Sequence, residues 1–157
     1  MSSRSAEITW LDCSFSEFTL QQLYAVIQLR QSVFVVEQNC PYLDADGVDP
    51  DSRHLLGYVN GELVLYTRYF LHPTHPNEGV IGRVIVKANY RQKGLGLLLM
   101  QQTEHCLRAS FPVDCISLGA QAHLQYFYQQ LGYVVNGEQY DEDGIPHLPM
   151  IKIYSAS

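Results

Sequence analysis

The stretch VIVKANYRQKGLGLLLMQQTEHCLR, residues 84–108, joins a strand-like segment to a helix-like segment through a short basic loop. The β-branched run at its start predicts a buried strand, and the apolar residues after Gly96 recur at helical spacing. The loop between them, residues 91–96, holds two glycines, which let the backbone turn sharply and approach a neighbour closely. A strand, a glycine loop and a helix in this order predict a fold in which helices pack on a sheet.

Strand-like and helix-like segments alternate along the rest of the chain. The dipeptide Asn60-Gly61 suits the positive φ angles of a type I′ turn, so residues 54–72 are predicted to form a β-hairpin. The other expected elements are strands at 7–15, 79–87 and 115–121, helices at 19–34 and 123–131, and two strands within 133–154. This order predicts an α/β (α+β) fold with a mixed central sheet and helices on both faces. We expect a single domain spanning 1–157, without repeats or linkers.

The first predicted helix begins with Thr19 and Gln22, which are spaced as a capping box. Its apolar residues on one helical face are Leu20, Leu23, Tyr24, Ile27 and Phe34. Arg30 and Gln31 interrupt that face. Either this polar pair marks an edge that faces a site, or Arg30 extends its charged end to solvent along the apolar surface.

The charge balance opposes nucleic acid as a partner. Lys and Arg number 10 against 16 Asp and Glu, for a net charge of -6, and binding to a phosphate backbone depends on positive charge. No segment has the length and apolarity of a signal peptide or a membrane span. We therefore expect a cytoplasmic protein with no membrane association. The four cysteines form no C-x-x-C pair, so we expect no metal site.

The basic glycine loop predicts an anion site. Free N–H groups and the positive end of the helix dipole meet there, and Arg91 and Lys93 add charge. A P-loop would place Gly-Lys-Ser/Thr at its end, whereas Lys93 precedes Gly94 here. A dinucleotide fingerprint would have a third glycine where Leu99 stands. The remaining possibility is that the loop binds a diphosphate but belongs to neither of these two types.

The loop fits the pattern Gln/Arg-x-x-Gly-x-Gly/Ala, and in this it resembles the GNAT family of acyl-CoA-dependent N-acyltransferases. AHLQYFYQQLGY, residues 122–133, is similar to the family's helix that ends Phe-Tyr-x-x-x-Gly-aromatic. LRQSVFVVEQNCPYLDADGVD and YDEDGIPHLPM resemble the ElaA-like subfamily, so the likeness extends over about residues 8–153. It implies a GNAT fold and an acetyl-CoA-dependent N-acetyltransferase, monomeric or homodimeric, that acetylates a small amine or a peptide amine.

Two other functions remain open. LRQSVFVVEQ followed by an acidic loop also resembles acyl-homoserine-lactone synthases, which use a different acceptor. A protein of this kind can also bind acyl-CoA as a sensor without turning it over, because donor binding and acceptor chemistry depend on different residues.

The resemblance assigns residues to the donor. The backbone of Val84, Ile85 and Val86 would hydrogen-bond the pantetheine arm, and the strand at 115–118 would splay away to admit it. Gln121 stands where many members have Asn, and Tyr128 matches the tyrosine that protonates the leaving thiolate. The remaining residues assigned to the donor are Arg91, Gln92, Lys93, Gly94, Leu95, Gly96 and Phe127.

The acceptor side is less defined. An alkylamine is protonated at neutral pH, so a base is required, and Glu37, Glu142 and His147 are the candidates, each acting directly or through water. The acidic loop, residues 44–51, either attracts a cationic acceptor through Asp44 and Asp46, beside Arg30, or is a solvated surface loop. Its spacing does not match an EF-hand.

Overall fold

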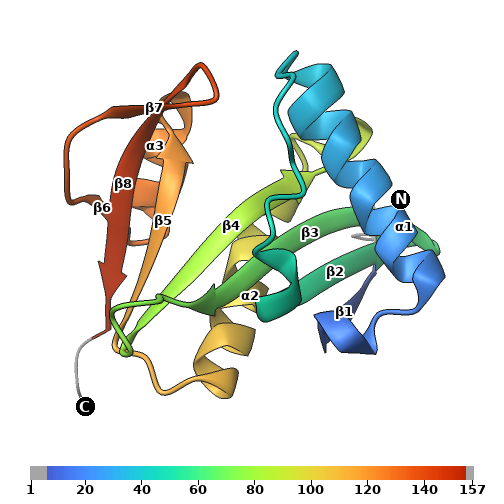
Figure 1. Ribbon diagram of the computed structural model, residues 1–157, viewed down its shortest axis with the longest axis horizontal. Helices are drawn as coiled ribbons and strands as arrows, with labels where there is room; N and C mark the ends of the chain where they lie inside the picture. Colours follow the sequence, from blue (N-terminus) through green and yellow to red (C-terminus); the bar gives the residue numbers. More distant parts are fainter. Residues whose placement is uncertain (1–6, 155–157) are drawn as a thin grey trace, which may run out of the picture.

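An eight-stranded mixed sheet forms the centre of the protein in the computed structural model, which describes residues 7–154 (Figure 1). The strand order is β1-β2-β3-β4-β5-β8-β6, with β7 also paired to β8. The only parallel pairing among these residues is between β4 and β5. The strands are β1 (Ile8–Ser14), β2 (Arg53–Val59), β3 (Glu62–Leu71), β4 (Glu78–Val86), β5 (Cys115–Gln121), β6 (Val134–Val135), β7 (Tyr140–Glu142) and β8 (Ile145–Ile153).

Helices cover both faces of this sheet, as predicted (Figure 1). Helix α1 (Leu20–Arg30) and the π-helical segment η2 (Gln31–Glu37) pack on one face, over a core that includes Leu56 and Tyr66. Helices α2 (Leu95–Ser110) and α3 (Gln125–Gln130) pack on the other, over a larger core. Short 3₁₀ turns are η1 (Phe15–Glu17), η3 (Asp49–Asp51), η4 (Ala88–Tyr90) and η5 (Ala122–Leu124). Within residues 7–154 no helix has the length and apolarity needed to cross a membrane.

The predicted hairpin is confirmed. Strands β2 and β3 pair antiparallel around Asn60 and Gly61, whose φ angles are 51° and 78°, as a type I′ turn requires. The C-terminal region differs from the prediction, because the polar loop contains the additional short strand β7 and the region therefore forms three strands instead of two. Two residues after α3, Gly132 has a φ of 99° and ends the helix as predicted.

The buried face of α1 is not the one the apolar pattern predicted. The capping box at Thr19 and Gln22 is present, but Leu20 is 85% exposed and Tyr24 72% exposed. The buried residues are instead Val26, Leu29, Arg30 and Val33, which also recur at helical spacing. The prediction failed because it treated Arg30 as an interruption of the buried face. Arg30 is in fact at the centre of that face, where it pairs with carboxylates.

The π-helical turns of η2 carry the chain from α1 to the middle of the sheet. A π-helix is wider than an α-helix and is often found at functional sites. This one ends at Glu37, and Gln38 is its C-cap. Both residues line the large cleft described below.

Strands β4 and β5 separate after a short paired region. Residues Glu78–Val80 pair with Cys115–Ser117 and the two strands diverge beyond them (Figure 1). β4 also carries a bulge, where the register with β3 shifts between Tyr66 and Arg68, and Arg83 has a φ of 51°. The diverging strands leave backbone N–H and C=O groups of β4 without a neighbouring strand, so that edge can pair with an extended ligand.

Candidate functional site

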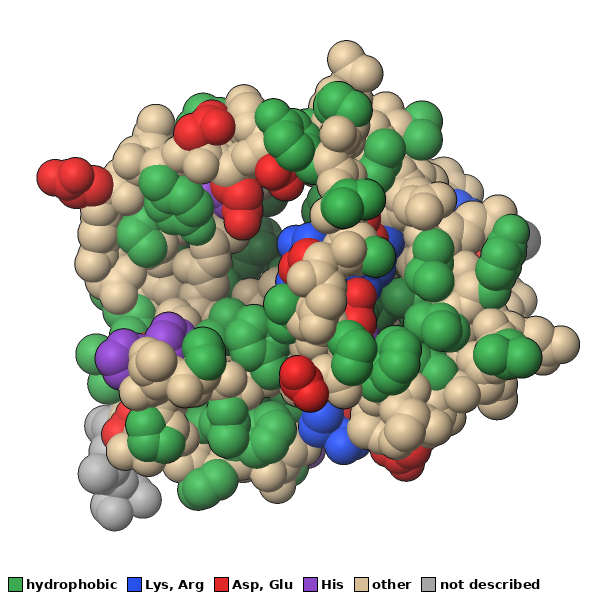
Figure 2. All heavy atoms as spheres, in the orientation of Figure 1, with side chains coloured by type: hydrophobic (Ala, Val, Ile, Leu, Met, Phe, Trp, Pro, Cys, Tyr) green, Lys and Arg blue, Asp and Glu red, His purple; other side chains and the backbone are tan. Residues whose placement is uncertain are grey.

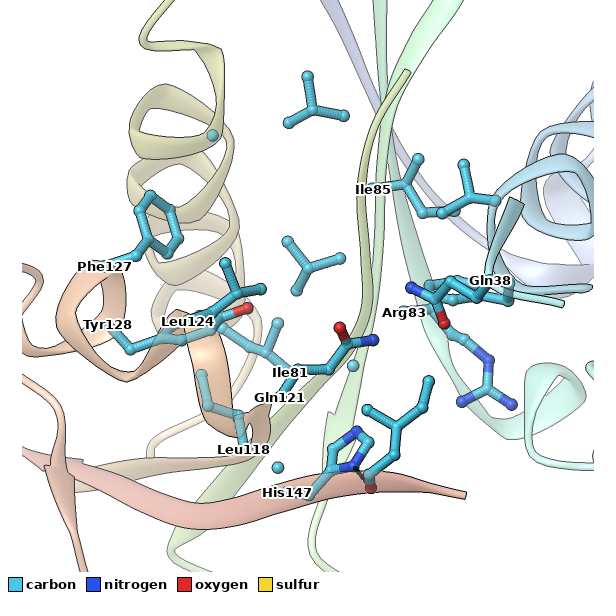
Figure 3. Close-up of a pocket in the computed structure, with 18 of the residues that line it drawn as sticks. Gln38, Ile81, Arg83, Ile85, Leu118, Gln121, Leu124, Phe127, Tyr128 and His147 are labelled. Atoms are coloured by element: carbon cyan, nitrogen blue, oxygen red, sulfur yellow. Dashed lines mark hydrogen bonds between the residues drawn. The ribbon is translucent and has the colours of Figure 1, made fainter. Parts of the chain in front are cut away.

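A cleft of about 900 Å³ opens where β4 and β5 diverge. Figure 2 shows a hollow near the centre of this face, with acidic side chains on the side of β7 and β8, and acidic and basic side chains together on the side of α1. In Figure 3, Phe127 and Tyr128 enter the cleft from α3, Gln38 and Arg83 lie on the opposite side, and His147 extends from β8. The cleft is therefore apolar toward α3 and polar toward η2 and β8.

The glycine loop forms one end of the cleft. Gln92 and Gly94 both have left-handed backbone conformations, with φ angles of 64° and 77°, and Gly94 is the N-cap of α2. Such a loop directs several N–H groups toward one point, to which the positive end of the helix dipole adds. A Cβ built on Gly94 would meet no atom within 4 Å, whereas one on Gly96 would lie 3.3 Å from Phe127 Cζ. The surface at Gly94 is open to an anion.

Arg91 connects the glycine loop to the opposite wall. Its Nε donates to the carbonyl of Val86 at 2.9 Å, and its Nη1 donates to Glu37 Oε2 at 2.8 Å. The carboxylate of Glu37 is thus engaged at the glycine-loop end of the cleft. Lys93, which was predicted to bind the donor, does not line the cleft and lies with its Nζ 5.4 Å from the ring centroid of Tyr90.

Tyr128 is the titratable group most deeply buried in the apolar wall. It is 5% exposed, and removal from water raises its pKa to about 12. Its ring packs edge-on against Phe127 and Tyr133. The hydroxyl has no hydrogen-bond partner among residues 7–154 and points into the cleft in Figure 3. Tyr126, on the same helix, is exposed.

His147 and Glu142 face each other at the other end of the cleft. The Nδ1 of His147 lies 2.8 Å from the carbonyl of Ile145, so that nitrogen carries a proton and donates it there. The Nε2 then faces Glu142 Oε2 at 3.2 Å. The ring of Tyr140 stacks on the imidazole with the centroids 5.7 Å apart. The imidazole is buried and oriented on both sides, with a half-exposed carboxylate beside it.

The aspartates of the acidic loop are bound by three arginines. Arg30 pairs with Asp44 at 2.7 Å and with Asp49 at 2.6 Å, and Arg68 pairs with Asp46 at 2.6 Å and with Asp49 at 3.0 Å. The third member, Arg83, donates to Asp44 at 2.9 Å. Hydrogen bonding to Arg68 holds the pKa of Asp46 well below its usual range.

This network changes the interpretation of the acidic loop and of Arg30. Arg30 is 2% exposed, so it does not extend to solvent, and neither Arg30 nor Asp46 lines the cleft. The loop is exposed at Asp46 and Asp51, yet the carboxylates of Asp44, Asp46 and Asp49 are held in ion pairs, and of these three residues only Asp44 lines the cleft. Guanidinium groups neutralise the charge of Asp44 and Asp46. The structure therefore gives no support to these two residues as attractors of a cationic acceptor.

Most of the other predicted site residues do meet in one place. Lining residues that the sequence also indicated are Glu37, Val84, Ile85, Val86, Arg91, Gln92, Gly94, Leu95, Gly96, Gln121, Phe127, Tyr128, Glu142 and His147. The side chain of Ile85 packs in the core beneath α1, so only its backbone can contact a ligand in the cleft. Arg83 and Gln38 also line the cleft, but they were not predicted from the sequence as site residues. An arginine within the apolar run GVIGRVIV was the available signal for Arg83.

Comparison with known proteins identifies the family. The model of the acetyltransferase (GNAT) domain matches residues 19–154. Protein ElaA of Escherichia coli K12 is 48% identical over 147 residues, which is 92% of this chain and 96% of ElaA. The crystal structure of Escherichia coli ElaA superposes with a TM-score of 0.87 over 93% of this chain and 99% of its own.

Two further structures extend the comparison. An acyl-CoA N-acyltransferase from Pseudomonas aeruginosa is 40% identical, with a TM-score of 0.84 over 92% of this chain and 99% of its own. The AHL synthase LasI, at 12% identity and a TM-score of 0.77 over 94% of this chain and 90% of its own, shares the fold alone. By sequence and by structure, the chain belongs to the GNAT acetyltransferase family and is similar to ElaA over nearly its whole length.

Proposed function

We propose that this protein transfers an acetyl group from acetyl-CoA to a primary amine by direct attack within a ternary complex. The observation that carries the proposal is the divergence of β4 and β5 beside the glycine loop, with the Tyr128 hydroxyl pointing into the gap. One end of this cleft suits a diphosphate, its middle suits an extended arm that can hydrogen-bond a strand edge, and its other end holds oriented groups that can exchange protons.

The residues present fit acetyl-CoA as the donor. The backbone of β4 at Val84 and Val86 has no strand partner on the β5 side and would hydrogen-bond the pantetheine arm there like an added strand, beside the Val86 carbonyl that accepts from Arg91. The N–H groups of residues 92–96, with Arg91, would hold the diphosphate, while Gln121 and Phe127 border the arm. When bound, the donor supplies an acetyl group activated as a thioester.

Tyr128 is suited to act as the acid. Because burial raises its pKa to about 12, it keeps its proton at neutral pH and can give it to a sulfur that leaves with the electron pair of the C–S bond. As the C–N bond forms, the nitrogen loses a proton, and this proton returns Tyr128 to its protonated form. An N–H group at the bulge of β4, where the ladder with β3 is interrupted, would stabilise the charge that develops on the carbonyl oxygen.

The pair formed by His147 and Glu142 is suited to act as the base. It faces the cleft with an oriented imidazole, takes the first proton from the ammonium form of the acceptor, and passes it to solvent through the half-exposed carboxylate. Glu37 is less suited, because its carboxylate is held by Arg91 at the donor end. This ordering gives one net proton released for each acetyl group transferred.

The test is mass spectrometry of amines incubated with the protein and acetyl-CoA. The panel holds polyamines, amino sugars, amino acids and peptide amines, and each product should gain one acetyl group while one CoA thiol is released. Parallel reactions with long-chain acyl-CoA separate an acetyltransferase from an acyl-homoserine-lactone-synthase-like enzyme, which would prefer the long chains. Binding of acetyl-CoA without product from any amine would contradict the proposal and indicate a sensor.

A further inference from the structure

Arg83 places a hydrogen-bond donor with unused N–H groups at the acceptor end of the cleft. Its Nε and Nη2 are bound to Asp44, at 2.9 and 3.1 Å, and Nη2 also lies 3.4 Å from Asp46. Its Nη1 has no hydrogen-bond partner among residues 7–154. The guanidinium is about one quarter exposed, lies 5.7 Å above the ring of Phe34, and lines the cleft. The guanidinium is therefore a fixed hydrogen-bond donor, some of whose N–H groups have no partner among the described residues.

The surrounding network holds this guanidinium in place and leaves its Nη1 available to a ligand. Three arginines face three aspartates, so the six formal charges sum to zero. Arg30 and Arg68 are buried within the network, and Arg83 is its most exposed arginine. Arg83 has a left-handed backbone conformation at the bulge and lines the cleft. Asp44 also lines the cleft, but its carboxylate is 8% exposed and bound to Arg30 and Arg83, so the free donor that an acceptor would meet is the Arg83 Nη1.

The wall of the cleft opposite Arg83 carries acidic side chains. Glu142 and Asp143, at the turn between β7 and β8, line the cleft beside His147. Glu142 has its imidazole partner but is otherwise half exposed. The Cys40 thiol lies 3.5 Å from the carbonyl of Asp143, which connects the loop after η2 to this turn. The wall that holds Arg83 and the wall that holds Glu142 are thus joined at one rim.

A separate observation shows that a ligand belongs between these walls. The Tyr128 side chain is at least nine-tenths buried, its hydroxyl has no partner among the described residues, and it points into the cleft (Figure 3). Gln38 and Gln121 extend neutral amides into the same space from opposite sides. The polar lining therefore surrounds a reacting position instead of a solvated surface.

We propose that the acceptor carries both a primary amine and a nearby carboxylate, as an α-amino acid does. Arg83 receives the carboxylate, and the Glu142–His147 pair receives the ammonium group and its proton. This inference rests on the proposed acetyl transfer and specifies its substrate class. A polyamine would suit the acidic wall, but it would leave the Arg83 N–H without a partner and place a cation next to a cation.

The test compares three forms of the same scaffold, so no acceptor needs to be identified beforehand. Each L-amino acid of a panel is assayed beside its α-carboxamide and the amine that lacks the carboxyl group, with product measured by mass spectrometry and CoA release. The acid should exceed both other forms in kcat/KM by roughly tenfold to hundredfold, the value of one hydrogen bond to a charged group.

The variant Arg83→Gln should reduce this preference for the acid form to a few-fold, through a higher acceptor KM and with the KM for acetyl-CoA unchanged. Arg53→Gln is the matched control, because Arg53 is similarly exposed, pairs with Asp12 and lies outside the cleft. Thermal midpoints of both variants verify folding, and Arg83→Lys restores part of the preference if charge alone suffices.

The outcomes separate this inference from the proposed function. Acetylation of amines or carboxamides as fast as of the acids would overturn the carboxylate site while leaving acetyl transfer intact. A full preference for acids in Arg83→Gln would also overturn it. Absence of any acetylated product would overturn the acetyl transfer itself, and the acceptor class with it.

Discussion

The carboxylate of Glu37 lies 2.8 Å from the guanidinium of Arg91, and this ion pair joins the end of η2 to the glycine loop across the cleft. Both side chains are about 39% exposed, so the pair itself contributes little to stability. Its position matters more than its strength, because it places a negative charge beside the proposed diphosphate site.

Glu37→Gln is therefore expected to strengthen CoA binding by up to about fivefold, since one repulsive charge of roughly 1 kcal/mol in water is removed. The turnover number should stay near that of the unmodified protein, because Glu142 and His147 take the proton. Calorimetric titration with CoA and steady-state kinetics measure the two quantities. Glu138→Gln, outside the cleft, controls for net charge. A loss of 10²-fold or more in kcat would assign the base to Glu37 instead.

Gly94→Asp should abolish the rise in thermal midpoint that CoA gives the unmodified protein. Gly94 has a φ of 77°, a conformation that Asp and Asn tolerate better than other non-glycine residues. Gly94→Asn, which has the same shape without the charge, is the matched control and should keep most of the rise. A normal rise in Gly94→Asp would refute the diphosphate site.

Tyr128→Phe should lower kcat by roughly 10²- to 10⁴-fold while CoA affinity is nearly retained. Because the hydroxyl has no partner among residues 7–154, its removal should cost less than about 1 kcal/mol of stability. The exposed Tyr126 supplies the control Tyr126→Phe. With a pKa raised to about 12, Tyr128 stays protonated as pH rises through 10, so its ionisation should cause no fall in kcat there. Equal rates in both variants would identify Tyr128 as a packing residue.

The aspartate–arginine network should make the protein sensitive to acid. The pKa of Asp46 is lowered mainly by its hydrogen bond to Arg68, so its contribution is present above the ordinary aspartate pKa of about 3.9 and is lost as pH falls through the lowered value. Asp46→Asn should lower stability at pH 7 and weaken the decline below pH 4, as measured by urea unfolding at several pH values. Asp51→Asn, at an exposed position, should change neither. An unchanged acid dependence in Asp46→Asn would contradict this account.

Local rules were sufficient for much of the fold. The type I′ turn at Asn60 and Gly61, the capping box at Thr19 and the glycine stop after α3 were all predicted and are present, because each depends on neighbours within a few residues. The glycine loop was predicted for the same reason. These local signals, with the family resemblance, predicted that the glycine loop and Tyr128 belong to one site, and both line the cleft.

Contacts between distant residues decided the acceptor end. The sequence shows Asp44 and Asp46 as a run of acidic residues, and no periodicity reveals that Arg30, Arg68 and Arg83 converge on them from α1, β3 and β4. The buried face of α1 was missed because a paired arginine can occupy an apolar stripe. The pairing of His147 with Glu142 depends likewise on the turn between β7 and β8. Charge in a sequence is a property of single residues, whereas neutralisation requires a partner that only the folded chain brings within hydrogen-bonding distance.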